Sequence, residues 1–319
     1  MLKIPESIDN KFKEGKTDST YRTYLIMLSK LFKELFDTTE FSVDKLKETN
    51  KVKNYLKDLS VTSQKLISIA IVMILKASNS KKDLIDFYGK LAKAYRIQDK
   101  DMRKNREATE EEKITHITWS YIKEMKKSYK DFLMNSDKSF MPELAYKRLF
   151  MGWVCFELLT IIPPQRGECL FNCYINKDVK GSNIIDTKKR QWIIRESKTK
   201  RSYGERIIPL NDCLIEVIKQ WMEISNCKDG LLICNDMGSK MSTQSYTQFL
   251  NSTVFRTYAS RNVSTDDLRK AYVTHMIVHI GVDKKERDTM ARVLGHSPET
   301  MMCLYFKPEL ETNILLGGN

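Results

Sequence analysis

The sequence lacks any long hydrophobic run. Its most apolar stretch, residues 66–75, is far shorter than the ~20 residues that a bilayer-spanning helix needs, and it predicts a buried helix instead. The N-terminal segment MLKIPESIDNKF has no apolar signal core. We therefore expect no membrane partner and an intracellular location, either the cytoplasm of a prokaryote or, for a viral protein, the host nucleus or the virion.

Cysteine and histidine are scarce, with 7 and 4 residues in a chain of 319. Cys169 and Cys173 are close neighbours, but no second cysteine pair or histidine completes a zinc-binding set near them. An odd number of scattered cysteines in a chain of this size indicates reduced thiols. We expect no metal site and no cofactor.

Acidic residues are too few to balance the basic ones. Lys and Arg number 54 against 41 Asp and Glu, which gives a net charge of +13. Such an excess is typical of proteins that bind a polyanion, most often nucleic acid. A lysine-rich surface with no particular partner remains an alternative on charge alone.

Glycine and proline are also few, with 12 and 7 residues, and the sequence contains no internal repeat. Apolar periodicity predicts an all-helical N-terminal domain, residues 1–96, with helices near 18–36, 43–58, 62–77 and 81–95. The charged stretch 97–113 has no such periodicity and predicts an exposed linker to a second domain, residues 114–319. We expect an α+β fold that is mainly α with a small β-sheet.

The second domain combines helices with a short β-rich section. Helices are expected near 117–132 and 142–162, and strands at 183–186, 191–196 and 205–210. The polar turn KTKRSYG between the last two strands is typical of a hairpin tip. The remaining helices are expected near 211–224, 243–258, 264–279, 284–293 and 298–304.

Three basic residues occupy places suited to holding a phosphate. Arg166 follows the helix-stopping pair Pro163-Pro164, and Lys198 lies in the hairpin turn, where Lys200 and Arg201 compete with it. Arg269 lies in the first turns of a helix that Ser264 or Thr265 can cap. Each residue taken singly is also compatible with an ordinary surface position.

A histidine and a tyrosine follow near the C-terminus. Leu294-Gly295-His296 precedes Tyr305 by nine residues, within LGHSPETMMCLY. The spacing allows both side chains to face one site, although a tyrosine in such a stretch is commonly a core residue. A tyrosine hydroxyl needs cations around its target before it can act as a nucleophile.

In order and context these motifs resemble the tyrosine recombinase (phage integrase) family. The resemblance rests on RKAYVTH, on HIGVDKKERDTMARVLGHSPETMMCLYFKP, on the hairpin ESKTKRSYGERIIPL and on the N-terminal TYRTYLIMLSKLF, which is similar to the family's core-binding helix. It implies an N-terminal helical core-binding domain followed by a catalytic domain. It also implies that the catalytic residues are Arg166, Lys198, Arg269, His296 and Tyr305, and that Lys200, Arg201 and Arg22 contact DNA.

The sequence departs from the family pattern at two positions. The family's histidine three residues before the second arginine is Asp266 here, and the acidic residue after the first arginine, Glu168, stands two residues on instead of three. Gln165 is therefore an alternative counterpart of the first arginine. We favour Arg166, because the Pro-Pro context can shift the loop by one residue.

The resemblance implies a site-specific recombinase or integrase of viral or mobile-element type. It would cut and rejoin double-stranded DNA through a 3′-phosphotyrosine, without metal or ATP, as a homo-oligomer, a tetramer on DNA. Two alternatives stay open: relaxation of DNA as by a type IB topoisomerase, and a DNA-binding protein of the same fold that has lost strand exchange. The apolar C-terminal stretch ELETNILLGGN would suit docking on a neighbouring subunit.

Overall fold

The computed structural model describes residues 1–104, 116–136, 140–225, 230–256, 259, 262–308 and 310. The chain divides into two compact units, Met1–Arg106 and Glu107–Asn319. None of the helices in the described residues is long and apolar enough to cross a membrane. The predicted C-terminal docking stretch lies almost wholly outside the described residues.

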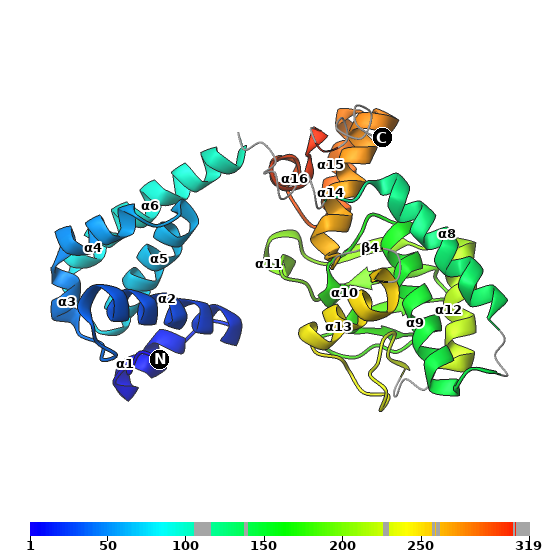
Figure 1. The fold of residues 1–319 in the computed structure, drawn as a ribbon, viewed down its shortest axis with the longest axis horizontal. Coiled ribbons are helices and arrows are strands. Elements are labelled where there is room, and N and C mark those ends of the chain that lie inside the picture. Colours follow the sequence, from blue (N-terminus) through cyan, green and yellow to red (C-terminus); the bar gives the residue numbers. More distant parts are fainter. Residues whose placement is uncertain are drawn as a thin grey trace. The chain divides into compact units, whose positions relative to one another are not determined.

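The first unit is helical throughout its described elements (Figure 1). Its helices are α1 (Glu6–Lys13), α2 (Asp18–Phe36), α3 (Val43–Lys47), α4 (Thr49–Lys57), α5 (Val61–Ala77) and α6 (Lys82–Lys104). Helix α5 is central and packs against α6, α2 and α1. Its apolar residues Ile67, Ile71, Ile74 and Leu75 are buried, as the apolar run predicts.

Two expectations for this unit are wrong. The predicted helix 43–58 is interrupted at Glu48, whose ψ of 57° is not helical. Helix α6 continues to Lys104, so residues 97–104 of the predicted linker are helical and residues 105–113 lie outside the described part of the chain. The extension is held by a polar contact that apolar periodicity does not reveal: buried Asp99 accepts a hydrogen bond from Thr62 at 2.9 Å and pairs with Lys65.

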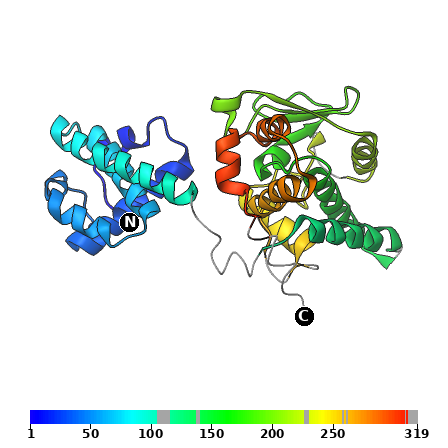
Figure 2. The ribbon, with the colours of Figure 1, turned by 90° about the horizontal axis from the view of Figure 1, so that it is seen from above.

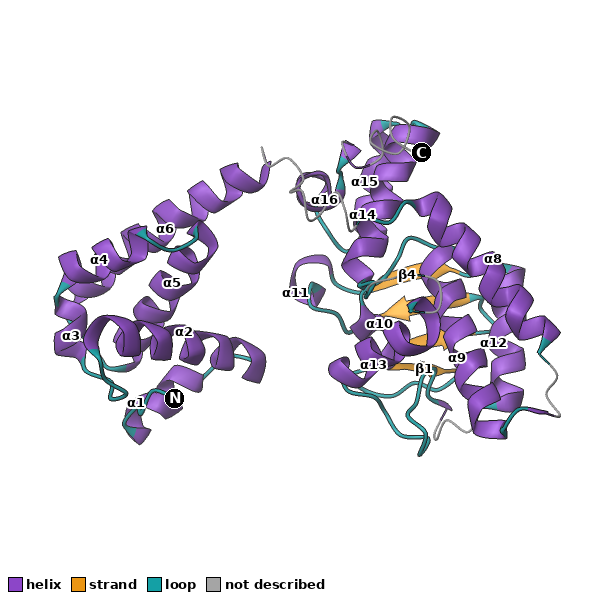
Figure 3. Ribbon diagram, viewed as in Figure 1, coloured by secondary structure: helices purple, strands orange, loops and turns teal. Residues whose placement is uncertain are grey.

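The second unit places helices around one small sheet (Figure 3). Its first helices are α8 (Trp119–Asn135), α9 (Glu143–Thr160) and α10 (Gly167–Phe171), and α11 (Lys200–Tyr203) lies within the hairpin turn. The remaining helices are α12 (Asp212–Ile224), α13 (Thr243–Phe249), α14 (Thr265–His275), α15 (Lys284–Leu294) and α16 (Pro298–Tyr305). Helix α9 is buried from Phe150 to Leu159 on every face, which confirms its predicted central place.

The sheet has the strand order β1-β2-β3-β4. The strands are β1 (Cys173–Ile175), β2 (Asn183–Asp186), β3 (Gln191–Ile194) and β4 (Arg206–Pro209). The last three confirm the predicted strands within a residue or two. The sequence missed β1, which pairs with β2 in parallel, because three residues carry too little alternation to be recognised.

Two predicted helices change pitch along their length. Residues 243–258 divide into α13 and the π-helix η3 (Leu250–Phe255), and α14 continues into the π-helix η4 (Met276–Ile280) before Gly281 ends it. Helix α14 packs against α16, shown in red in Figure 2. Five described cysteines, 155, 169, 173, 213 and 303, are free, whereas Cys234 is disulfide-bonded, so the expectation of reduced thiols does not hold for Cys234.

A close contact at Gly152 gives a test of the packing that supports the site. A Cβ at Gly152 would meet the Tyr129 hydroxyl, which donates to the Leu149 carbonyl at 2.8 Å, and would also approach Val254 at 3.2 Å. We expect Gly152→Ala to lower the free energy of unfolding by about 1–3 kcal/mol through overpacking. The measurement is urea denaturation.

Gly89 in α6 is the matched control, because a Cβ there meets no atom within 4 Å. Gly89→Ala should raise the free energy of unfolding by about 0.5–1 kcal/mol, since alanine restricts the unfolded chain more than glycine does. Destabilisation of the same size by both substitutions would contradict the packing explanation.

Candidate active site

The N-terminus of α14 is fixed by a reciprocal capping box. The Ser264 hydroxyl accepts from the backbone amide of Asp267 at 3.1 Å, and the Asp267 carboxylate accepts from the amide of Ser264 at 2.9 Å. This cap sets where the first helical turn begins. It thereby determines where Asp266 and Arg269 project.

Arg269 lies at the centre of the candidate site and is fully buried. Its Nε donates to the Pro164 carbonyl at 3.0 Å, one Nη donates to the Leu294 carbonyl at 2.5 Å, and the other donates to the Tyr305 hydroxyl at 2.9 Å. Burial lowers the pKa of this guanidinium, but an arginine remains charged in proteins. One cation therefore joins the loop after α9, the end of α15 and the end of α16.

His296 follows Gly295, which ends α15 in the left-handed conformation with φ of 70°. Its Nε2 lies 3.1 Å from an Arg166 Nη, 3.2 Å from an Arg269 Nη and 3.1 Å from the Tyr305 hydroxyl. Burial, followed by the charges of Arg269, Arg166 and Arg206, lowers the pKa of His296 from 6.5 to about 3. The ring is therefore neutral at physiological pH, and Nε2 acts as an acceptor facing guanidinium donors.

Tyr305 is the last residue of α16 and is only 4% exposed. Its hydroxyl accepts from Arg269 and also lies 3.4 Å from the Asp266 carboxylate oxygen, Oδ1. Burial raises the pKa of Tyr305, and Arg269 only partly opposes this effect. The hydroxyl is thus protonated at neutral pH and requires an acceptor for its proton before it can attack.

Arg166 is the N-cap residue of α10, and its guanidinium faces His296 and donates to the Thr199 hydroxyl at 3.4 Å. Gln165, the alternative counterpart, is buried beside Arg206 and accepts a hydrogen bond from it at 2.9 Å. At this position the structure therefore brings Arg166, and not Gln165, next to His296 and Thr199.

Lys198 lies on the exposed turn between β3 and β4. Its backbone amide donates to a Glu168 carboxylate oxygen at 3.1 Å, which fastens the turn to α10. Its ammonium forms no hydrogen bond or ion pair with another described residue. The backbone of Lys198 is thus held beside α10, and its flexible side chain is free to extend toward a phosphate at Arg166.

The other predicted DNA contacts lie outside this cluster. Lys200 is exposed and pairs with Glu196 at 2.5 Å, and Arg201 is exposed on α11. Arg22 is exposed on α2 in the first unit. Their exposure is compatible with backbone contacts to DNA and gives no indication of a catalytic role.

Arg206, which was not among the residues predicted from the sequence, lies beneath the site. It donates to Gln165 and to the Val293 carbonyl, and a Cβ on Gly295 would approach its guanidinium carbon at 3.1 Å. The strand alternation carries the missed signal, because Arg206 shares the inward face of β4 with buried Ile208. A charged residue on a buried face of a strand is uncommon unless it has a specific role.

Three arginines of the site have no carboxylate within ion-pair distance among the described residues. These arginines are Arg166, Arg206 and Arg269. Arg269 is buried and Arg166 and Arg206 are half-buried, and gathering these like charges costs free energy that an incoming anion would offset. The arrangement is a preorganised anion site with a tyrosine hydroxyl inside it.

Part of the second unit matches a known protein family. Residues 178–311 match the family model described as "Phage integrase family", a range that contains Lys198, Arg269, His296 and Tyr305. Over these residues the chain is similar to the phage integrase family. Arg166 precedes the matched range, and its assignment rests on the geometry described above. A search of curated proteins gives no significant match.

The fold of the chain is similar to that of a solved recombinase structure. The XerH site-specific recombinase in a post-cleavage complex with a palindromic difH substrate has a TM-score of 0.55 at 16% identity, over 92% of this chain and 78% of that one. XerA recombinase gives 0.43 at 13% identity, with 97% of both chains covered. The Tn1549 transposon integrase in complex with transposon right-end DNA gives 0.42 at 14%, with 92% and 99% covered.

The environment of His296 predicts its titration. We expect the ring to stay neutral, with its proton on Nδ1, from pH 8 to about pH 5, because its pKa is about 3. Imidazole ¹⁵N NMR measures this directly, and His296→Asn assigns the signal. A transition near pH 6.5 in that signal would contradict the proposed environment.

The same shift also links His296 to stability. Its pKa is lower in the folded state than the ordinary 6.5, so the unfolded chain takes up this proton first as the pH falls. The contribution is fully present above pH 6.5 and is lost progressively toward pH 3. The unfolding temperature of His296→Asn should therefore depend less on pH across this window than that of the unmodified protein.

Proposed function

We propose that this protein is a site-specific DNA recombinase that cuts and rejoins duplex DNA through a covalent bond between Tyr305 and a 3′-phosphate. One observation carries the proposal. The Tyr305 hydroxyl lies 2.9 Å from Arg269 and 3.1 Å from His296, inside a cluster of guanidiniums that form no ion pairs among the described residues. Phosphodiester DNA supplies the anion that such a cluster lacks, and the net charge of +13 suits a long polyanion.

The chemistry is a phosphoryl transfer. Arg166 and Arg269 hold the non-bridging oxygens, whose negative charge grows in the transition state. The Tyr305 oxygen forms a bond to phosphorus while the bond from phosphorus to the 5′-oxygen breaks, and Lys198 donates a proton to that leaving oxygen. Attack by a 5′-hydroxyl on the phosphotyrosine reverses these steps, so strands are rejoined without ATP or metal.

Asp266 accepts the proton that Tyr305 loses when it attacks. Two acceptors lie near the Tyr305 hydroxyl, His296 Nε2 at 3.1 Å and Asp266 Oδ1 at 3.4 Å. His296 is a weak base because burial and the arginines hold its pKa at about 3. We therefore assign Asp266 as the acceptor of the tyrosine proton, with the neutral His296 accepting from the guanidiniums of Arg166 and Arg269 and so holding them in place.

Recombination between two duplexes requires that several copies of the chain assemble on DNA. We extend the proposal to a homo-oligomer, a tetramer on DNA, in which the first unit and the exposed residues Lys200, Arg201 and Arg22 contact the phosphate backbone. A protein that relaxes DNA as a monomer would form the same covalent bond. Strand exchange between two differently labelled duplexes distinguishes the two activities.

Tyr305→Phe tests the nucleophile. The protein is incubated with nicked duplexes of random sequence, and covalent protein–DNA adducts are recovered under denaturing conditions and sequenced. We expect adducts with the unmodified protein and none with Tyr305→Phe, because the phenyl ring has no attacking oxygen. Tyr272→Phe, a half-buried tyrosine on α14, is the matched control and should retain the adduct.

The outcomes separate the alternatives. An adduct that persists in Tyr305→Phe would remove the nucleophile assignment. DNA binding without any adduct from the unmodified protein would favour a binding protein of the same fold that has lost strand cleavage.

Substitutions at Asp266 test the proton acceptor. Asp266→Asn keeps the size of the side chain but cannot accept the proton as a base, so we expect cleavage to slow by about 10²-fold or more. Asp266→His should preserve or raise the cleavage rate and give it a dependence on histidine titration. The measurement is the single-turnover cleavage rate as a function of pH, and equal rates for Asp266→Asn and the unmodified protein would argue against the role.

A further inference from the structure

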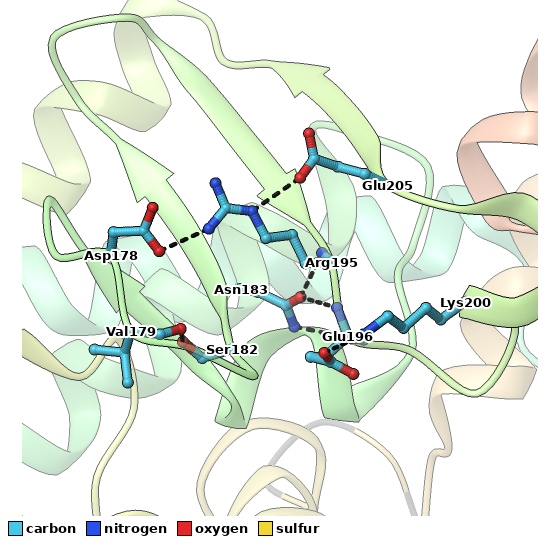
Figure 4. Close-up of polar contacts among 8 residues, drawn as sticks. All are labelled: Asp178, Val179, Ser182, Asn183, Arg195, Glu196, Lys200 and Glu205. Carbon is cyan, nitrogen blue, oxygen red and sulfur yellow. Dashed lines mark hydrogen bonds and ion pairs between the residues drawn. The ribbon is translucent and has the colours of Figure 1, made fainter.

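A fully buried asparagine, Asn183, connects the two segments that carry Arg166 and Lys198. It is the first residue of β2, and its side chain points away from the strand pairing and toward the exit of β3 (Figure 4). A buried amide must satisfy two donors and an acceptor. The partners of this amide show what it holds in place.

On one side Asn183 fixes the chain that leads to Lys198. Its Oδ1 accepts from the backbone amides of Arg195 at 2.9 Å and Glu196 at 2.8 Å, and its Nδ2 donates to the Glu196 carbonyl at 3.1 Å. Strand β3 has already ended at Ile194. The side chain thus continues the hydrogen bonding of β3 by two residues, up to the start of the catalytic turn.

On the other side the same Nδ2 reaches the chain that follows Arg166. It lies 3.3 Å from the Cys169 carbonyl and 3.4 Å from the Glu168 carbonyl, both in α10, whose N-cap is Arg166. One rigid amide therefore spans the backbone two to three residues after Arg166 and the backbone two to three residues before Lys198.

Two weaker contacts join the same segments further along the turn. The Lys198 amide donates to Glu168 at 3.1 Å, and Arg166 donates to the Thr199 hydroxyl at 3.4 Å. Both involve exposed or half-buried groups that water can also serve. The buried amide of Asn183 has no such substitute, because neither its donors nor its acceptor can reach water.

We propose that Asn183 is a positioning residue for strand cleavage, which sets the place of the Lys198 turn relative to the phosphate held at Arg166. The inference rests on the proposed function. Proton transfer from a lysine to the leaving 5′-oxygen needs hydrogen-bond geometry, and a displacement of about 1 Å can cost about 10²-fold in rate. Asn183 acts through Lys198 and does not itself touch DNA.

The test uses a leaving group that needs no proton. Single-turnover cleavage is measured on a DNA site identified by sequencing the covalent adducts. The substrate carries either oxygen or sulfur at the scissile 5′-bridging position. A thiolate leaves without a general acid, so a defect confined to Lys198 disappears with sulfur. Lys198→Ala is the positive control for this relief, and Arg166→Ala, which loses phosphate stabilisation, should stay slow on both substrates.

We expect Asn183→Ala to cleave the oxygen substrate about 10²-fold more slowly and to recover most of the rate on the sulfur substrate. Asn183→Asp, which keeps the acceptor and loses the donors, should show the same signature if Asn183→Ala fails to fold. Amide hydrogen exchange in residues 195–204 should quicken in both variants.

Asn176 offers a matched control in the same sheet, because it follows β1 and fixes the chain that leaves β2. Its Oδ1 accepts from the amide and the hydroxyl of Thr187, and its φ is 55°, a conformation that glycine also adopts. Asn176→Gly removes an asparagine that fixes a loop away from the site, and it should leave both cleavage rates unchanged.

Each outcome bears on one proposal. An Asn183 variant that cleaves the oxygen substrate at the unmodified rate, or one that is slow on both substrates, overturns the positioning role while the recombinase function stands. Failure of the unmodified protein to form an adduct with either substrate overturns the proposed function, and the positioning role falls with it.

Discussion

The organisation of the catalytic unit depends on a single buried cation, Arg269. Its guanidinium binds the carbonyls of Pro164 and Leu294 and the hydroxyl of Tyr305, so segments more than a hundred residues apart in the sequence meet around one side chain. A buried charge is tolerated only where hydrogen-bond acceptors surround it. Here the acceptors are neutral oxygens, which satisfy the donors without cancelling the charge. The same contacts that assemble α14, α15 and α16 therefore leave a positive field at the tyrosine.

That field explains the state of the other groups in the site. Burial, followed by the charges of Arg269, Arg166 and Arg206, keeps His296 from taking up a second proton and lowers its pKa to about 3. A neutral histidine adds no repulsion to the cluster and offers one acceptor and one donor. Tyr305 experiences the opposite balance, because burial raises its pKa more than Arg269 lowers it. Without DNA, the site thus keeps the Tyr305 hydroxyl protonated and its arginines charged. A bound phosphate would pair with these charges and place phosphorus beside the hydroxyl.

The parts of this site that sequence predicts are those specified locally. Three helix ends are marked by local signals: the capping serine of α14, the glycine after α15 and the proline pair before Arg166. The structure has the helices where these signals place them. Arg206 and Asn183 were missed because their roles depend on which strands pair. Helix α6 runs past residue 96 for a similar reason, since Asp99 finds Lys65 and Thr62 on a neighbouring helix. Long-range partners of polar residues leave no periodic signal in the sequence.

The aspartate at the position of the family's histidine is consistent with the physics of the cluster. A carboxylate buried against Arg269 would form an ion pair and remove the charge that a phosphate needs. Asp266 instead stands in the first, exposed turn of α14, where water screens it, and only its Oδ1 approaches the Tyr305 hydroxyl at 3.4 Å. Arg269, on the buried face of the same helix, keeps a field that solvent weakens little. Helix α14 can therefore carry a proton acceptor on its exposed side and a cation on its buried side, and the negative charge of Asp266 does not neutralise that of Arg269.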